Sequence, residues 1–128
     1  RVFNSLKEVD MADTEDLMPS ELSGGMKKRV GIARAIAIKP TYLFYDEPTT
    51  GLDPVMTDSI NRLILKFQRT GEVTSVIITH EMQTAYDVAD RVLLLHDGKI
   101  WFDGSPEEIK SVDDLVIQQF ITGNSTLV

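Results

Sequence analysis

The sequence predicts an α/β domain built on a mostly parallel sheet with flanking helices. Residues 41–46 and 75–80 are short apolar runs of the kind that form buried strands, and helical patterns precede, separate and follow them. Strands that alternate with helices favour parallel pairing, because a parallel pair needs a long crossover connection. The 128 residues, of which 42% are hydrophobic, suffice for one modest core.

Two helices are predicted before the first strand. Residues 2–10 have apolar side chains at helical spacing, and Pro19 lies in the polar connection that follows. Ser23 is placed to cap a second helix over residues 24–38, and Pro40 closes that helix.

The clearest helix lies between the two strands. Pro54 opens it, and Gly71 follows it as a C-cap. Its apolar residues repeat at the helical period; they are Met56, Ile60, Leu63, Ile64 and Phe67. A short helix over residues 82–89 comes after the second strand.

The C-terminal residues predict a hairpin and two helices. Asp97-Gly98 is a hairpin turn signal that pairs a strand over residues 91–96 with residues 99–104. Ser105 caps the next helix, and a last helix spans residues 112–121.

The charge and composition exclude several classes of protein. A net charge of −7 argues against a nucleic-acid partner, since such proteins present a basic face to phosphates. The exception is a local basic cluster of Lys27, Lys28, Arg29 and Arg34. There is no cysteine for disulfides or thiolate metal sites, and no apolar run is long enough for a membrane span.

Two carboxylates end the first strand. Neighbouring side chains of an extended backbone point in opposite directions, so Asp46 and Glu47 can serve different partners. Asp46 is suited to hold Mg2+ through its water shell, and Glu47 to accept a proton from an attacking water, as phosphoryl transfer requires. The alternative is an acidic strand end beside a proline turn.

His80 closes the second strand, and two glycines open a helix. An imidazole at the same sheet edge can hydrogen-bond a phosphate oxygen, although a structural histidine is the alternative. The other histidine, His96, is interpreted as solvated. Ser23, Gly24 and Gly25 lie at a predicted helix start, whose unpaired N–H groups favour a phosphate; the alternative there is a plain serine cap.

Taken in order, these motifs resemble the ATP-binding cassette (ABC) ATPases. Residues 22–25, Leu-Ser-Gly-Gly, resemble the family's signature motif, and residues 43–46 with Glu47 resemble its Walker B strand and catalytic glutamate. Gly51-Leu52-Asp53 resembles the D-loop, and His80 matches the switch histidine.

The resemblance implies ATP and Mg2+ as cofactors and a dimer as the working form. In that dimer, Ser23, Gly24 and Gly25 of one subunit contact the nucleotide held by the other. Asp46 supports the metal, Glu47 activates water, His80 stabilises the γ-phosphate, and Asp53 communicates across the dimer.

A narrower resemblance concerns cargo and location. Met26, which follows the signature glycines, and the run QQFITG at residues 118–123 resemble the ATPases of Mce-associated, Mla-type lipid transporters. That resemblance implies transmembrane permease partners and a peripheral place on the cytoplasmic face of the inner membrane. It also suggests that the C-terminal tail, residues 120–128, grips a partner subunit; the alternative is a tail that frays.

The phosphate loop of the family, G-x-x-x-x-G-K-[ST], is missing from the 128 residues. We therefore expect the C-terminal portion of one ABC ATPase domain: residues 1–40 with the signature motif, 41–104 as the core, and 105–128 as C-terminal helices. The Walker A strand would lie upstream. The isolated chain is expected to be inactive. With unpaired strand edges, it is expected either to form an intertwined or strand-exchanged oligomer or to be observed only as the ordered or proteolysed part of a longer protein. The alternatives are an ABC-type ATPase of DNA maintenance or translation, and a catalytically dead structural piece.

Overall fold

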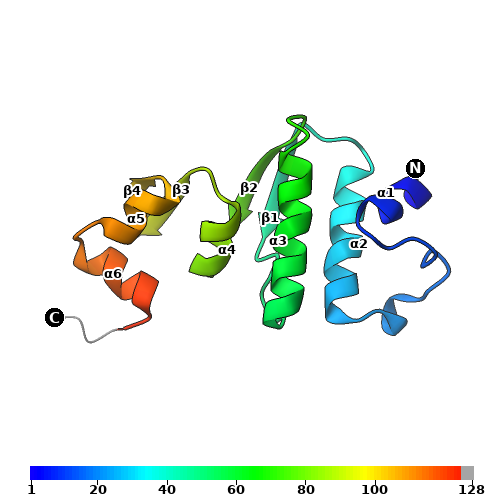
Figure 1. Ribbon diagram of the computed structural model, residues 1–128, viewed down its shortest axis with the longest axis horizontal. Coiled ribbons are helices and arrows are strands. Elements are labelled where there is room, and N and C mark those ends of the chain that lie inside the picture. Colours follow the sequence, from blue (N-terminus) through cyan, green and yellow to red (C-terminus); the bar gives the residue numbers. More distant parts are fainter. Residues whose placement is uncertain (125–128) are drawn as a thin grey trace. The chain divides into compact units, whose positions relative to one another are not determined.

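The strands predicted at residues 41–46 and 75–80 pair in parallel in the computed structural model, which describes residues 1–124 (Figure 1). Strand β1 (Tyr42–Asp46) is in register with β2 (Thr74–Ile78), so that Asp46 lies opposite Ile78. The second strand ends two residues earlier than predicted, before His80. The chain divides into two compact units, Arg1–His80 and Glu81–Val128, and each is described by itself.

The helices of the first unit follow the sequence closely. They are α1 (Val2–Glu8), the 3-10 helix η1 (Pro19–Glu21), α2 (Gly24–Ile36) and α3 (Pro54–Gln68). Ser23 caps α2 as predicted, whereas Gly71 lies beyond the C-cap of α3, which is Arg69. Gly71 has φ of 70°, and its N–H donates to the Gln68 carbonyl at 3.0 Å, so it closes the turn after the helix.

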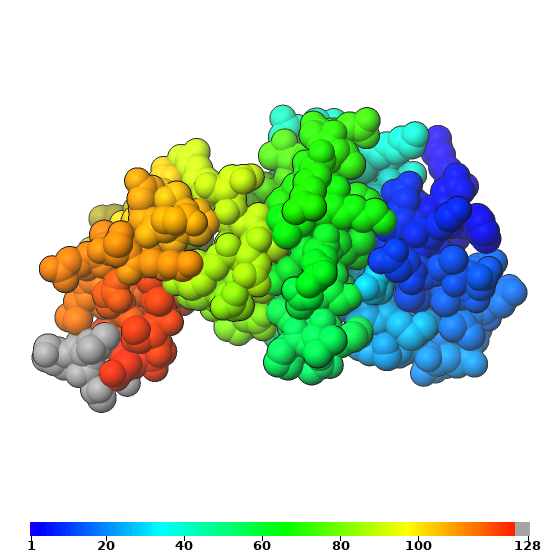
Figure 2. Space-filling view, in the orientation of Figure 1, coloured from blue at the N-terminus to red at the C-terminus, as the bar shows by residue number. Residues whose placement is uncertain are grey.

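The core of the first unit lies on one face of the parallel pair. Helices α1 and α2 pack against each other, and α2 also contacts α3 (Figures 1 and 2). Its buried apolar side chains come from α1 and its C-cap, α2, β1 and α3; they include Leu6, Val9, Ile32, Ile36, Leu43, Tyr45, Ile60, Leu63 and Ile64.

The expectation of fully buried strands is wrong for β1 and β2. Leu43 and Tyr45 are buried, but Phe44 between them is 69% exposed. In β2, Val76 and Ile78 are also exposed. Side chains alternate between the two faces of a strand, and among the described residues helices cover only one of those faces.

The second unit is a hairpin packed on short helices. Its elements are α4 (Met82–Val88), β3 (Val92–His96), β4 (Lys99–Gly104), α5 (Pro106–Ser111) and α6 (Leu115–Thr122). The predicted turn is confirmed, since Asp97 and Gly98 both have positive φ, 48° and 72°. The predicted cap at Ser105 is also confirmed, but α6 begins at Leu115 because Asp114 caps it.

The strands of the described residues form two separate pairs. β1 and β2 are parallel, and β3 and β4 are antiparallel, where the sequence predicts one mostly parallel sheet. The second unit has its own core of Leu94, Ile109 and Ile117. Within residues 1–124, no helix has both the length and the apolar character needed to cross a bilayer.

Candidate functional site

Glu47 lies where β1 ends, in an unusual backbone conformation. Its φ is 48°, in the left-handed region that non-glycine residues rarely occupy. The Glu47 N–H donates to the Ile78 carbonyl at 2.8 Å, which continues the contact with the β2 strand. From the other side, the Lys28 ammonium group donates to the Glu47 carbonyl at 2.8 Å. Both backbone polar groups of Glu47 are therefore held.

The Glu47 carboxylate meets His80. Oε1 lies 2.9 Å from Nδ1 of His80, and Oε2 accepts hydrogen bonds from Oγ1 of Thr50 at 2.8 Å and Thr79 at 3.4 Å. An ionised carboxylate can only accept, so the His80 Nδ1 carries the proton in this contact. The structure thus brings together Glu47 and His80, the two residues predicted to be catalytic, and their roles stay predictions.

The surroundings of Glu47 favour its ionised form. The hydrogen bond from His80 is the largest cause that lowers the pKa of this carboxyl, and the hydrogen bond from Thr50 lowers it further. Glu47 is therefore a carboxylate at neutral pH, which is the form that can accept a proton.

Replacing His80 with alanine is expected to raise the pKa of Glu47 toward the usual glutamate value of 4.5, because the largest lowering cause is removed. NMR titration of the Glu47 carboxyl carbon measures the change. His96→Ala, at the only other histidine, is the matched control and should leave the Glu47 pKa unchanged. An unshifted Glu47 pKa in His80→Ala would contradict the assigned contact.

The lowered pKa of Glu47 also predicts how the stability of the fold depends on pH. The pKa of Glu47 is lower in the folded state than its usual value, so the ionised carboxylate stabilises the fold at pH above about 4.5. This contribution is lost as the pH falls through the folded-state pKa.

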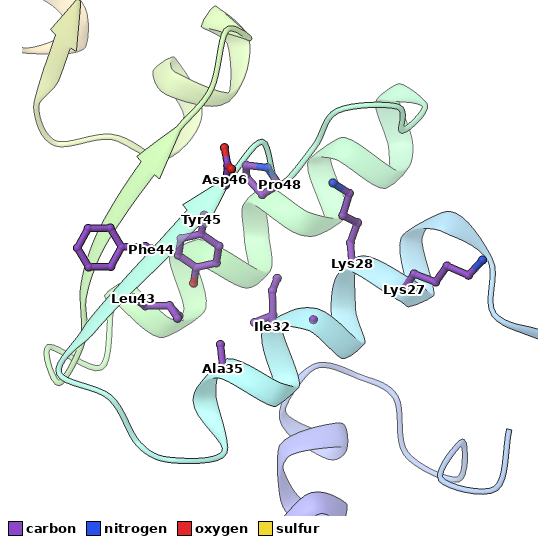
Figure 3. A pocket seen from close by; sticks show the side chains of 10 residues that line it. Lys27, Lys28, Ile32, Ala35, Leu43, Phe44, Tyr45, Asp46 and Pro48 are labelled. Atoms are coloured by element: carbon purple, nitrogen blue, oxygen red, sulfur yellow. The ribbon is translucent and has the colours of Figure 1, made fainter. Parts of the chain in front are cut away.

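Asp46 lies beside a cavity of about 200 Å³ between α2 and β1 (Figure 3). Its carboxylate is exposed at the strand end, near Pro48. No group of three metal-ligating side chains gathers anywhere in residues 1–124. One carboxylate fits Mg2+ only where substrate phosphates and water complete the coordination, which is the usual arrangement for this ion. Asp46 therefore fits the predicted metal role only in the presence of a nucleotide.

The signature-like motif forms the start of α2. The Ser23 hydroxyl accepts a hydrogen bond from the Met26 N–H at 3.3 Å, so the capping role is present. Gly25 is buried, and a Cβ at this position would lie 1.8 Å from the terminal methyl of Met56 in α3. The flexible end of Met56 can shift to make room, so packing alone does not require glycine here. The contact of Ser23, Gly24 and Gly25 with phosphate stays a prediction.

Asp53, predicted in the D-loop, caps α3. Its carboxylate accepts from the N–H groups of Val55 and Met56 at 2.9 and 3.0 Å. These bonds satisfy two of the unpaired donors at the helix start. The role of Asp53 across a dimer stays a prediction, and the capping contact is compatible with it.

Two of the four cations in the basic cluster, Lys28 and Arg29, make contacts within the first unit, whereas Lys27 and Arg34 are exposed. The Arg29 side chain is only 15% exposed and donates to the Val9 carbonyl, to Asp10 at 3.1 Å and to Ser59 at 2.5 Å. Lys28 is directed at Glu47. Packing of α2 against its neighbours turns both cations inward.

His96, interpreted as solvated, keeps 40% of its side chain exposed and also contacts Trp101. Its ring meets the edge of Trp101 with the two ring centroids 5.4 Å apart. The hairpin brings these two residues of β3 and β4 together.

Known proteins resemble this chain over most of its length. A solved structure of CbiO1 from Clostridium perfringens, described as part of the ABC transporter complex CbiONQ, superposes with a TM-score of 0.80 at 31% identity, and the match covers 92% of this chain and 47% of that one. The family model described as ABC transporter matches residues 1–50. The L-cystine import ATP-binding protein TcyN of Bacillus subtilis is 44% identical over 83% of this chain and 40% of its own length. The chain belongs to the ABC transporter ATP-binding family.

A second relative of this ABC family matches a longer part of the chain. The intermembrane phospholipid transport system ATP-binding protein MlaF of Haemophilus influenzae is 36% identical over 97% of this chain and 47% of its own length. The chain thus spans between two fifths and one half of the curated relatives described. The predicted fold class, that of an ABC ATPase, is confirmed by the CbiO1 superposition.

The sequence did not point to every residue around Glu47. Lys28, Thr50 and Thr79 all contact it, and none was singled out for that contact. The only local signal is the pair of threonines at residues 49 and 50, close behind the strand. The other two contacts depend on how the ABC core packs.

Proposed function

We propose that this chain supplies the signature motif and the hydrolytic end of an ATPase subunit that drives an ABC transporter. The observation that carries the proposal is the 2.9 Å contact between Glu47 Oε1 and His80 Nδ1 at the carboxyl ends of two parallel strands. Ligands of open parallel sheets bind at that edge. A base and an orienting imidazole at such an edge suit the activation of a water molecule for attack on a phosphate.

Each site residue has a proposed part in the reaction. Glu47 accepts the proton of the attacking water, and His80 holds the Glu47 carboxylate and meets the γ-phosphate. Asp46 holds the water shell of Mg2+, which would neutralise charge on the phosphates. Ser23, with the N–H groups at the start of α2, contacts the phosphate of a nucleotide bound by a second subunit.

The 128 residues contain no G-x-x-x-x-G-K-[ST] loop. We propose that this loop belongs to sequence outside the 128 residues, and we call the chain joined to it the complete subunit. By itself the chain is proposed to be inactive, because Glu47 and His80 then have no tightly held nucleotide to act on. The proposed division of the domain is residues 1–40, 41–104 and 105–128.

Replacing Ser23 with alanine tests the contact in trans. In the complete subunit, steady-state ATP hydrolysis is expected to fall much more than the affinity of a monomeric subunit for ATP. Hydrolysis measured against subunit concentration and equilibrium ATP binding at high dilution give the two quantities. Ser111→Ala, at the end of α5, is the control for loss of a hydroxyl. Equal losses of hydrolysis and binding would contradict a contact with the partner's nucleotide.

Lipid is the proposed cargo of the transporter. The relative MlaF, named for phospholipid transport, matches 97% of this chain, whereas TcyN, named for cystine import, matches 83%. The longer match favours the lipid transporter. Import of an amino acid is the second candidate, because the identity with TcyN is higher, 44% against 36%.

The purified complex with its permease distinguishes the two cargoes. Stimulation of ATP hydrolysis by phospholipid vesicles, and not by L-cystine, supports lipid transport. The opposite result supports amino-acid import.

The proposed place of the complete subunit is the cytoplasmic face of the inner membrane, bound to transmembrane permease subunits. Residues 125–128 of the proposed partner-gripping tail lie outside the described residues.

The chain alone is proposed to form a strand-exchanged oligomer. Among residues 1–124, β1 pairs only with β2, so each strand of this pair has an edge without a described neighbour. Such edges pair readily with another chain. Sedimentation of the isolated 128 residues tests the proposal, and a monomer that unfolds cooperatively would contradict it.

A further inference from the structure

Lys28 links the start of α2 to the backbone of Glu47. It lies five residues beyond Ser23, and its partly buried Nζ is 2.8 Å from the Glu47 carbonyl oxygen. Lys28 reaches toward the end of β1, where Asp46 and Pro48 lie, whereas the neighbouring Lys27 points away from it (Figure 3). Lys27 is exposed. Two adjacent lysines therefore have different surroundings.

Lys28 contacts Glu47, a residue whose backbone conformation is stable only where neighbouring groups hold it. Glu47 has a positive φ, and non-glycine residues keep such a conformation only where the surrounding structure holds it. The Ile78 carbonyl accepts from the Glu47 N–H, so β2 holds the amide side of the residue. Lys28 holds the carbonyl side. These two attachments hold the backbone from which the Glu47 side chain extends.

We propose that Lys28 is a positioning residue for Glu47. Through this contact, the orientation of the proposed base depends on the position of α2, the helix that begins at the signature-like motif. This inference rests on the proposed function for its meaning in catalysis. Because the same helix begins with Ser23, Gly24 and Gly25, any displacement of α2 relative to β1 changes the distance from Nζ to the Glu47 carbonyl oxygen. A contact made at the helix start is thereby transmitted to the residue that activates water.

The first test measures the geometry without any nucleotide. In the 128-residue chain, Lys28→Met removes the ammonium group, and Lys27→Met is the matched control. NMR follows two signals of Glu47: the one-bond Cα–Hα coupling, which distinguishes positive from negative φ, and the titration of the carboxyl carbon. Both are expected to change in Lys28→Met and to match the wild type in Lys27→Met. Unchanged signals in both variants would overturn the proposal.

A chemical rescue separates positioning from a general effect on folding. The chain has no cysteine, so Lys28→Cys can be alkylated at that position alone. Aminoethylation restores a side chain with a terminal ammonium group, whereas carbamidomethylation does not. Recovery of the Glu47 signals after the first treatment only supports the proposal. Equal recovery after both treatments, or after neither, would overturn it.

The second test uses the complete subunit. Lys28→Met is expected to lower kcat for ATP hydrolysis roughly tenfold or more with little change in KM, since small displacements of a catalytic group have effects of up to about a hundredfold. Lys28→Arg keeps a cationic donor and is expected to recover most of the rate. A wild type without ATPase activity would refute the proposed function alone, because the NMR measurements test the link between Lys28 and Glu47 independently. Equal kcat in Lys28→Met and wild type would refute the positioning role.

Discussion

Glu47→Gln in the complete subunit is expected to slow ATP hydrolysis at least about a hundredfold while leaving ATP binding intact, because loss of a general base typically costs a factor of about 100 to 10,000. Glutamine keeps the shape of glutamate, so Thr50 and His80 retain a partner at this position. The amide cannot accept the proton of the attacking water. Single-turnover hydrolysis and equilibrium ATP binding, measured on the same preparation, give the two quantities.

The control for this substitution is a carboxylate remote from the site. Glu72→Gln, in the connection before β2, changes the net charge by the same amount at an exposed position. It is expected to leave the rate of hydrolysis unchanged. A Glu47→Gln variant that hydrolyses ATP as fast as the wild type would show that another group is the base.

Ile60→Ala is expected to destabilise the first unit by about 2 to 5 kcal/mol, the range for truncating a buried isoleucine. Ile60 has no exposed surface and belongs to the buried face of α3, whose N-cap Asp53 lies on the loop after Glu47. Truncation removes buried apolar area and leaves a cavity that the close-packed core fills only in part. Amide hydrogen exchange of α3 in increasing urea measures the change.

Val55→Ala is the matched control for Ile60→Ala. Val55 is on the same helix but is 76% exposed, so its truncation is expected to change stability by no more than about 0.5 kcal/mol. Tryptophan fluorescence does not serve this measurement, because the single tryptophan, Trp101, lies in the other unit. Equal destabilisation by both substitutions would contradict the placement of Ile60 in the core.

Local chemistry made several elements predictable. The caps at Ser23 and Ser105 and the turn at Asp97-Gly98 agree with the structure because each depends on a few adjacent residues. The helix boundary at Leu115 and the C-cap at Arg69 were missed. The sequence pattern alone did not select Asp114 among several residues able to cap, or decide where the last turn of α3 ends.

Burial was less predictable than secondary structure. A short apolar strand can have the same sequence pattern whether one or both of its faces are covered. The exposure of Phe44 and Ile78 was therefore not predicted. The inward contacts of two cations in the basic cluster could not be predicted for a related reason. Arg29 and Lys28 turn inward only because α1, α3 and the end of β1 lie next to α2.

By itself, the sequence determined the order and chemistry of the site: a serine and two glycines before a helix, a carboxylate pair after a strand, and a histidine after the next strand. Only the tertiary structure decided which of these groups meet. Glu47 reaches His80 across 33 residues of sequence because β1 and β2 pair in parallel, and it reaches Lys28 across 19 residues because α2 packs beside them. Contacts at such separations depend on strand register and helix packing, which residues near each motif do not encode.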